Sequence, residues 1–260
     1  MLRARGANMQ GKHYWVQGDN DEPRGSGYPM KVIALNMRVA RRFVVEHHYA
    51  KDWGAIGKLA LGLEQKGELV GVAIWGYGTR PLHTIRKCFP SLTSADYLEL
   101  VRFCVLDKMP RNTETQFLKM QIAMIKRLYP AIKLLYSWAD GLRGKPGYVY
   151  QAASWFYGGS IWSEFYMTSE GEVVHPRLLI TRDGRRDKEH TLALGLTKVH
   201  GFQFRYCKFL CSKGEMKRLL RESPLSWGQN YPKKEDLRFV IDAGEGSRES
   251  REVPNLKGSG

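Results

Sequence analysis

The chain has 260 residues, 43% of them hydrophobic and 12% aromatic, and its formal net charge is +15. This composition excludes a disordered or fibrous protein and predicts one well-packed domain with additions, or two small ones. No apolar run is long enough for a membrane span, and the polar first residues lack the apolar core of a signal peptide, so we expect a cytoplasmic protein without membrane partners. The charge favours a polyanionic partner such as nucleic acid, or else reflects a solvated basic surface.

The first third of the chain is predicted to contain short strands around one helix. In chain order, the pattern predicts a flexible segment over 1–29, a strand over 30–35, a helix over 36–50, a hairpin over 58–78 and a loop over 79–96. Asn36 is expected to cap the helix, because its side chain can accept from a free backbone N–H group. Val39 and Phe43 lie on one helical face with Ala40 and Val44, so we expect all four in the core.

The stretch YLELVRFCVLDKMPRNTETQFLKM holds an apolar run, a proline and a helix start. Its first part predicts a buried strand over 97–106, and Pro110 follows. The next helix is predicted over 114–129, with Thr113 as its cap and Gln116 reaching back. A strand that leads into a helix N-terminus directs several free backbone N–H groups at one point, where an anion can bind.

The remaining pattern completes an α/β fold class. It predicts a buried strand over 131–140, a helix over 147–159 and a second hairpin over 160–179. Strands separated by helices in this order indicate a mixed sheet with flanking helices. The chain then becomes basic, since residues 177–238 hold 15 Lys and Arg against 7 Asp and Glu, a net charge of +8. Residues 241–260 are poor in hydrophobic side chains and are predicted to be a disordered tail.

The order hairpin, long strand, capped helix, buried strand, helix and hairpin resembles the GNAT acyltransferase fold. This resemblance implies a GNAT-like catalytic core over 30–180. The positive charge of the chain that follows predicts a basic DNA-binding extension over 181–240 packed on the core. The resemblance also implies acetyl-CoA or a related activated donor, lying where two parallel strands splay apart, with its pyrophosphate at the following helix. The donor-binding residues would be Arg102, Arg111, Asn112 and Thr113. The loop KMPRNTETQ departs from the GNAT pattern, because it lacks the usual glycines.

Further motifs resemble the Mom family of phage DNA-modification proteins. They are EHHYA, YLELVRFCVLD, PRN, YSWADG, GYVYQAASWFYGG and the late RYCKFL, and the likeness extends over about residues 30–235. The family converts adenine in double-stranded DNA to N6-carbamoylmethyladenine, which protects phage DNA from host restriction. The resemblance therefore implies this activity, double-stranded DNA as the partner, the host cytoplasm as the location and iron as a cofactor. The residues linked to the family's active site match His48, Tyr49, Arg102, Asp140 and Tyr150.

The side chains of this set suit iron chemically. Tyr49, Asp140 and Tyr150 offer hard oxygen ligands, and His48 offers an imidazole, so these four are the expected catalytic residues and the first three the possible iron ligands. Simpler roles stay open. Asp140 ends a predicted strand and could close a turn, and His48 could lie on the surface beside His47 at a helix end.

Arg102 stands out because a charged residue inside an apolar strand needs an anionic partner. Two partners are possible, namely Asp140 from the neighbouring strand or the donor itself. Glu99 lies three residues earlier, and the spacing places it on the opposite strand face.

Adenine N6 is hidden inside a duplex, so we expect the base to flip out and to stack on one or two of the seven tryptophans. The cations expected to contact phosphates are Arg182, Arg185, Arg186, Arg205, Lys208, Lys217, Arg218, Lys233 and Lys234. Two other functions stay open: a GNAT-type N-acetyltransferase acting on RNA or protein amines, and a non-enzymatic DNA-binding protein.

Overall fold

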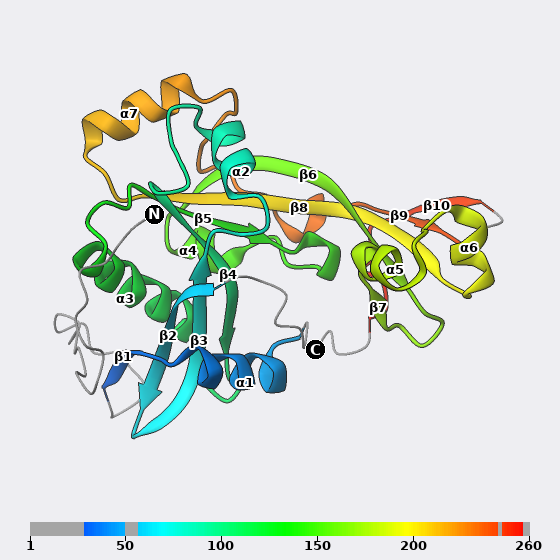
Figure 1. The fold of residues 1–260 in the computed structure, drawn as a ribbon, viewed down its shortest axis with the longest axis horizontal. Coiled ribbons are helices and arrows are strands. Elements are labelled where there is room, and N and C mark those ends of the chain that lie inside the picture. Colours follow the sequence, from blue (N-terminus) through cyan, green and yellow to red (C-terminus); the bar gives the residue numbers. More distant parts are fainter. Residues whose placement is uncertain (1–28, 50–56, 244–245, 257–260) are drawn as a thin grey trace. The chain divides into compact units, whose positions relative to one another are not determined.

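The computed structural model describes residues 29–49, 57–243 and 246–256 (Figure 1). The chain forms two compact units, which we call unit 1 and unit 2. Unit 1 runs to Ser137 and adds Ala152–Trp155 and Cys207–Ser226, whereas unit 2 holds Trp138–Gln151, Phe156–Tyr206 and the chain from Trp227 onward. No helix among the described residues is long and apolar enough to cross a membrane. The predicted flexible segment 1–29 falls almost entirely outside the described residues.

The sheet of unit 1 confirms the mixed α/β fold class. Its strands follow the order β1 to β5, with bounds Met30–Ala34, Gly57–Gln65, Glu68–Gly76, Tyr97–Val105 and Leu134–Ala139. The first four strands are antiparallel neighbours, and β4 pairs with β5 in parallel. The β2–β3 hairpin turns at Lys66 and Gly67, both with positive φ, as a tight two-residue turn requires.

The helices of unit 1 are α1 Met37–His47, α2 Pro81–Cys88, α3 Thr113–Leu128 and α7 Lys213–Glu222. The Asn36 side chain accepts from the Arg38 N–H group, which confirms the predicted cap of α1. Helix α2 replaces the loop that we predicted. Pro81 stands in its first turn, where proline is favoured, and Ile85 and Cys88 are buried one turn apart.

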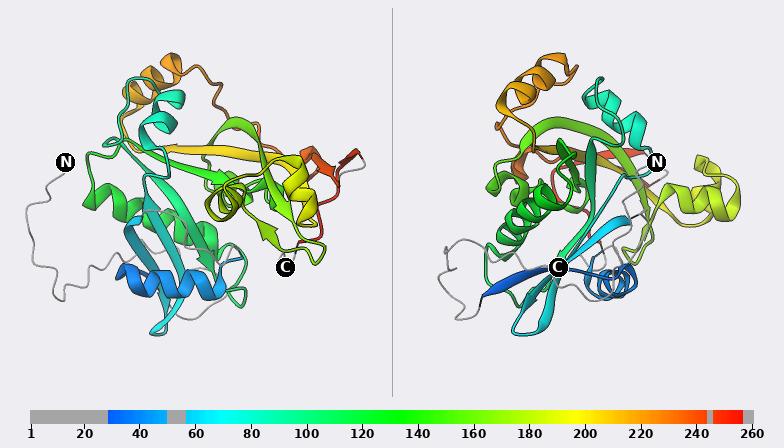
Figure 2. Two further views of the ribbon diagram at one scale, coloured as in Figure 1. Left: turned by 45° about the vertical axis from the view of Figure 1, so that its right-hand side comes forward. Right: turned by 60° about the vertical axis from the view of Figure 1, so that its left-hand side comes forward.

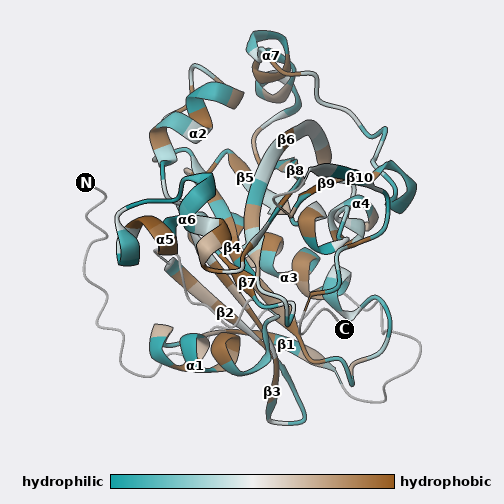
Figure 3. Cartoon of the chain, turned by 90° about the vertical axis from the view of Figure 1, so that its right-hand side faces the viewer, coloured by the Kyte–Doolittle hydropathy of each residue, from teal (hydrophilic) through white to brown (hydrophobic). Residues whose placement is uncertain are grey.

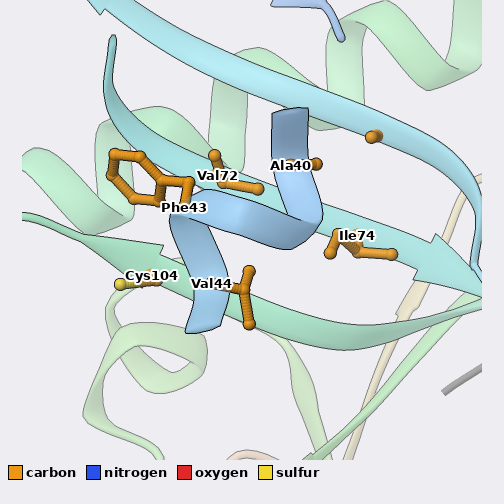
Figure 4. Close-up of a cluster of buried hydrophobic side chains, with 7 residues drawn as sticks. Ala40, Phe43, Val44, Val72, Ile74 and Cys104 are labelled. Carbon is orange, nitrogen blue, oxygen red and sulfur yellow. The ribbon is translucent and has the colours of Figure 1, made fainter. Parts of the chain in front are cut away.

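Helices α1 and α3 cover opposite faces of this sheet. Phe43 and Val44 of α1 pack with Ala40 against Val72, Ile74 and Cys104 (Figure 4). Phe117 of α3 instead stacks on Phe103, with ring centroids 5.6 Å apart. Because successive strand residues point to opposite faces, Cys104 and Phe103 mark the α1 face and the α3 face of the sheet. Figure 3 shows both hydrophobic and hydrophilic residues along α1. Val39 is 45% exposed, so its predicted place in the core is wrong.

Unit 2 is built on long strands (Figure 2). Strand β6 Phe156–Met167 lies between β8 Thr197–Phe209 and the short β7 Val173–Val174. Strand β9 Phe239–Asp242 pairs with β8, and β10 Ser247–Ser250 pairs with β9, both antiparallel. The helices are α4 Tyr148–Ala152, α5 Pro176–Asp183 and α6 Lys188–Ala193, with single turns at Gly141–Arg143 and Lys234–Asp236.

Three predictions for this part of the chain need correction. The helix predicted over 147–159 ends at Ala152, and β6 begins at Phe156, because the aromatic run that follows favours a strand. Disorder over 241–260 is wrong for the described residues there, since backbone pairing in the β9–β10 hairpin compensates for their low hydrophobicity. The units also cross the predicted limit at residue 180: residues 207–226 belong to unit 1, and 156–180 to unit 2.

Candidate functional site

Strand β4 carries a β-bulge at Val101. Its pairing with β3 places Ile74 opposite Arg102 but Trp75 opposite Leu100, so Val101 is an extra residue on β4. The Arg102 side chain donates from Nη1 to the Val101 carbonyl at 2.7 Å. A bulge bends the strand that carries it and re-aims the side chains that follow.

The bulge lies next to the end of the parallel ladder. In unit 1 the β4–β5 pairing runs from Tyr97–Leu134 to Leu100–Ser137, and β4 continues to Val105. The Ser137 hydroxyl donates to the Leu100 carbonyl at 3.3 Å at this last pair. The bend in β4 therefore falls where a GNAT-like fold is expected to part its two parallel strands.

The bulge also decides which face of the sheet the β4 side chains reach. Cross-strand partners share a face, so Arg102 shares the face of Ile74, and Glu99 shares that of Gly76. Ile74 and Gly76 are two residues apart on β3, and both belong to the α1 face. Glu99 and Arg102 therefore point to the same face. The prediction of opposite faces is wrong, because the extra residue shifts the alternation by one.

Glu99 is a candidate proton acceptor that sequence reasoning missed. Burial raises the pKa of its carboxyl from 4.5 to about 7. The carboxylate lies against Gly78, where a Cβ atom would overlap both of its oxygens. A carboxyl with this pKa exists in both protonation states near neutral pH and can serve as a general base. The missed signal was a charge in an apolar strand, the same signal that marked Arg102.

His48 and Tyr49 lie at the C-terminal end of α1. The His48 N–H group donates to the Val44 carbonyl at 2.9 Å and ends the helix. Its imidazole is buried and stacks on the Tyr49 ring, with centroids 4.2 Å apart and planes at 30°. The surface role considered for His48 instead fits His47, which lies 3.7 Å from the exposed Glu46. Helix α1 thus brings an ordered imidazole–phenol pair to the unit that holds Glu99.

The loop before α3 adopts a different cap from the predicted one. Asn112 occupies the N-cap position with a φ of +70° and makes no side-chain cap hydrogen bond. Thr113 is buried, and both its hydroxyl and its N–H group donate to the Pro110 carbonyl, at 2.7 and 3.2 Å. The predicted Thr113 capping box is therefore wrong. Its two donor groups are engaged inside the loop, so Thr113 is also a poor phosphate ligand.

Asn112 supplies a conformation that a glycine-rich loop would normally provide. Positive φ strains most side chains, and asparagine tolerates it best after glycine. Arg111 and Asn112 are exposed at this point. Gln116 N–H bonds to the Asn112 carbonyl at 3.0 Å, which leaves the N–H groups of Glu114 and Thr115 as first-turn donors. The loop can therefore meet an anion without a glycine.

Asp140 and Tyr150 belong to unit 2. The Asp140 carbonyl accepts from the N–H groups of Arg143 and Lys145, both at 3.1 Å, so this residue closes a turn after β5 as one alternative predicted. Its carboxylate lies 3.7 Å from Arg143 Nε. Tyr150 is buried, and its ring stacks on Tyr206 at a centroid distance of 5.1 Å. Both side chains are held in fixed surroundings.

The predicted iron ligands are divided between the units: Tyr49 belongs to unit 1, and Asp140 and Tyr150 belong to unit 2. Among the described residues there is no group of three or more His, Cys, Asp or Glu that could hold a metal ion. The Asp140 carboxylate faces an arginine, which competes with a cation for it. The arrangement described within either unit does not form an iron site by itself.

The predicted phosphate-binding cations fall into two classes. Exposed ones are Arg182, Arg185, Arg186, Lys217, Arg218, Lys233 and Lys234. Several of them form ion pairs, such as Arg185 with Asp187 at 2.7 Å and Arg218 with Glu222 at 2.8 Å. Exposed ion pairs are weak, so phosphates can compete for these side chains.

Two other cations bond to backbone carbonyls. Arg205 is 6% exposed, donates to the Gly158 carbonyl at 3.0 Å and lies over the Trp138 ring. Its predicted phosphate contact is wrong, because an apolar aromatic environment shields the guanidinium. Lys208 donates to the carbonyls of Ala153 and Ser154, both at 3.1 Å, and burial lowers its pKa.

Comparison with known proteins identifies the family. Residues 29–233 match the model of the Mom protein family. The chain belongs to this family. It is 33% identical over 207 residues to methylcarbamoylase Mom of Escherichia phage Mu, which covers 78% of this chain and 84% of that protein.

Solved structures with some likeness to this Mom-family chain include acetyltransferases. One is a protein of Acinetobacter baylyi ADP1 described as an acetyltransferase, with a TM-score of 0.41 and 12% identity, covering 72% of this chain and 96% of that one. Another is the ribosomal-protein-alanine N-acetyltransferase from Brucella melitensis, with a TM-score of 0.40 and 13% identity, covering 69% and 99%.

Proposed function

We propose that this protein transfers a carbamoylmethyl group to N6 of adenine in double-stranded DNA and so protects phage DNA from host restriction. The observation that carries the proposal is the 33% identity to a methylcarbamoylase over most of both chains. The residues linked to the family's active site, His48, Tyr49, Arg102, Asp140 and Tyr150, are all present, which supports the same activity in this chain.

The donor is proposed to be acetyl-CoA or a related activated compound held by unit 1. Three features support this: the bend at Val101, the Arg102 guanidinium beside it, and the start of α3. Arg111 would pair with donor phosphates, while first-turn N–H groups would donate to them. The left-handed Asn112 lets the loop turn without a glycine.

The chemistry requires more than ordinary acyl transfer. The lone pair of adenine N6 is delocalised into the ring, so the amine is a weak nucleophile. Carbamoylmethylation joins N6 to a methylene carbon of the activated donor. As this bond forms, the bond from that carbon to the donor's leaving group breaks, the leaving group takes the electron pair, and N6 loses a proton. Glu99 would accept this proton, since a pKa of about 7 leaves much of its carboxyl ionised at neutral pH.

DNA would bind through phosphates before any base is modified. The exposed cations of α5, α6 and α7 suit a duplex backbone, and adenine would then leave the stack to expose N6. This order explains why the chain combines a strong positive charge with a partly buried proton acceptor.

The proposal is tested by mass spectrometry of nucleosides from plasmid DNA in cells that express this protein. Carbamoylmethyladenine is expected in wild-type samples and absent from cells that express the Glu99→Gln variant. Acetylated nucleosides in RNA, with unmodified DNA, would replace the proposal by an RNA acetyltransferase. If DNA and RNA are both unmodified and the purified protein binds DNA tightly, the protein is a non-enzymatic DNA-binding protein.

A further inference from the structure

One face of the β6–β8 sheet in unit 2 combines aromatic rings with charged groups. Trp162 of β6 stands parallel to the His200 ring of β8, with planes at 4° and centroids 6.2 Å apart. Phe202 meets the Trp162 ring edge-on at 4.8 Å. Two residues along β6 from Trp162, Glu164 bonds to Lys198 of β8 at 2.8 Å. These contacts define the Trp162 face, because residues two apart on a strand share a side.

Trp162 is exposed although its neighbours hold it in place. Its side chain is 47% exposed, and the rings of His200 and Phe202 restrict its rotation. A large apolar ring left in water is unfavourable, so such a residue indicates a binding surface more strongly than an exposed leucine does. A fixed, flat and exposed indole is suited to stack on another flat ring with little loss of conformational entropy.

Cations gather further along the same two strands, around Tyr166 of β6 and Lys198 of β8. A pocket of 220 Å³ is lined in part by Tyr166, Arg186, Lys188 and Lys198. Tyr166 lies on β6, and Lys198 Nζ is 5.9 Å from the centre of its ring. One carboxylate, that of Glu164, lies 2.8 Å from both Arg186 and Lys198. The cations therefore outnumber the nearby carboxylates, Glu164 and Asp242, and positive charge is left to attract an anion.

We propose that the Trp162 face binds an unpaired base of a DNA strand. The base stacks on the indole of Trp162, and the phosphates of that strand contact Arg186, Lys188 and Lys198. A nucleic acid strand carries flat bases along a phosphate backbone. Proteins usually bind unpaired strands by stacking bases on aromatic side chains and by contacting the phosphates with cations. The inference rests on the proposed function in one respect, since flipping an adenine out of a duplex leaves its partner base unpaired.

The test compares two fluorescent duplexes of the same sequence, one fully paired and one with a single unpaired adenine. Fluorescence anisotropy gives the dissociation constants without any donor present. Wild-type protein should prefer the duplex with the unpaired base. Trp162→Ala should weaken binding to that duplex about tenfold and barely affect the paired one, because stacking on one base is removed. Trp162→Phe should keep most of the preference.

Two further variants separate stacking from charge and from general damage. Lys198→Ala should weaken binding to both duplexes and reduce the slope of log affinity against log salt by about one, as loss of one phosphate contact predicts. Tyr129→Ala removes an aromatic ring of similar exposure from unit 1, where Tyr129 is 41% exposed, and should bind both duplexes as wild-type protein does. Equal melting temperatures confirm that each variant is folded.

Two results would overturn the inference. One is Trp162→Ala protein that keeps the wild-type preference for the unpaired base. The other is unchanged DNA binding by this variant together with lost binding to anionic lipid vesicles, which would assign the face to a membrane. Nucleoside analysis is independent of these assays. If Trp162→Ala loses the preference for the unpaired base while wild-type protein makes no carbamoylmethyladenine, the proposed function is refuted and the inference stands.

Discussion

Glu99→Gln is expected to make the protein more stable at high pH while abolishing its activity. The substitution keeps the shape of the side chain and removes its charge. Folding raises the pKa of Glu99 from 4.5 to about 7, so ionised Glu99 opposes folding above pH 7. One pKa unit corresponds to about 1.4 kcal/mol, and the full difference is worth about 3 kcal/mol in the free energy of unfolding.

The sign of the pH dependence follows from proton binding. Between pH 4.5 and 7 the folded protein holds a proton on Glu99 that the unfolded chain has released. The unfolded state therefore binds fewer protons, and the contribution of this group to stability falls as pH rises through this window. Glutamine has no such dependence, so the advantage of the variant should be about 3 kcal/mol at pH 8 and fall to about 1 kcal/mol at pH 5.

Urea unfolding at pH 5, 6, 7 and 8 measures this difference directly, with stabilities extrapolated linearly to water. Glu46→Gln is the matched control, because Glu46 is exposed on α1 and its charge is solvated. It should differ little from wild-type protein at every pH. The reasoning fails if Glu99→Gln has the same stability as wild-type protein at pH 8, or if its advantage does not shrink at pH 5.

Three further predictions address the partners of the site. Replacing Arg185, Arg186 and Lys188 together with Ala should weaken DNA binding alike for all sequences and flatten its salt dependence; unchanged binding would locate the phosphates elsewhere. Arg111→Glu should abolish donor binding, measured by calorimetry with acetyl-CoA, since the new charge repels donor phosphates; unchanged affinity would exclude this loop as the phosphate site. Asp140→Asn should abolish DNA modification, measured by mass spectrometry of nucleosides, because Asp140 is among the residues linked to the family's active site; a variant that modifies adenine like wild-type protein would show that the Asp140 charge is not needed.

Most elements of unit 1 could be predicted because hydrophobic spacing and caps are local signals. The β2–β3 hairpin and the Asn36 cap needed only a few adjacent residues. The position of Glu99 relative to Arg102 could not be predicted in this way. It depends on one extra residue at Val101, which exists only in relation to the pairing of β3.

The burial of individual basic side chains could not be predicted from the sequence either. Arg205 and Arg186 are both arginines of the basic segment, yet one is buried on an aromatic ring and the other is exposed. Asn112 shows the same limit for backbone conformation, because a threonine followed by glutamine three residues later favoured a different cap. These outcomes depend on tertiary packing that overrides local preference.

The division of the chain into two units has a consequence for how the protein is made. Unit 1 contains Cys207–Ser226, which leaves the ribosome well after the strands that begin the unit. The unit therefore cannot be completed while the first 137 residues stand alone, and contacts across this long separation in sequence slow folding. A fragment that stops at Ser137 lacks α7 and the end of β8. Expression of unit 1 by itself thus calls for keeping all three of its segments, rather than for truncation.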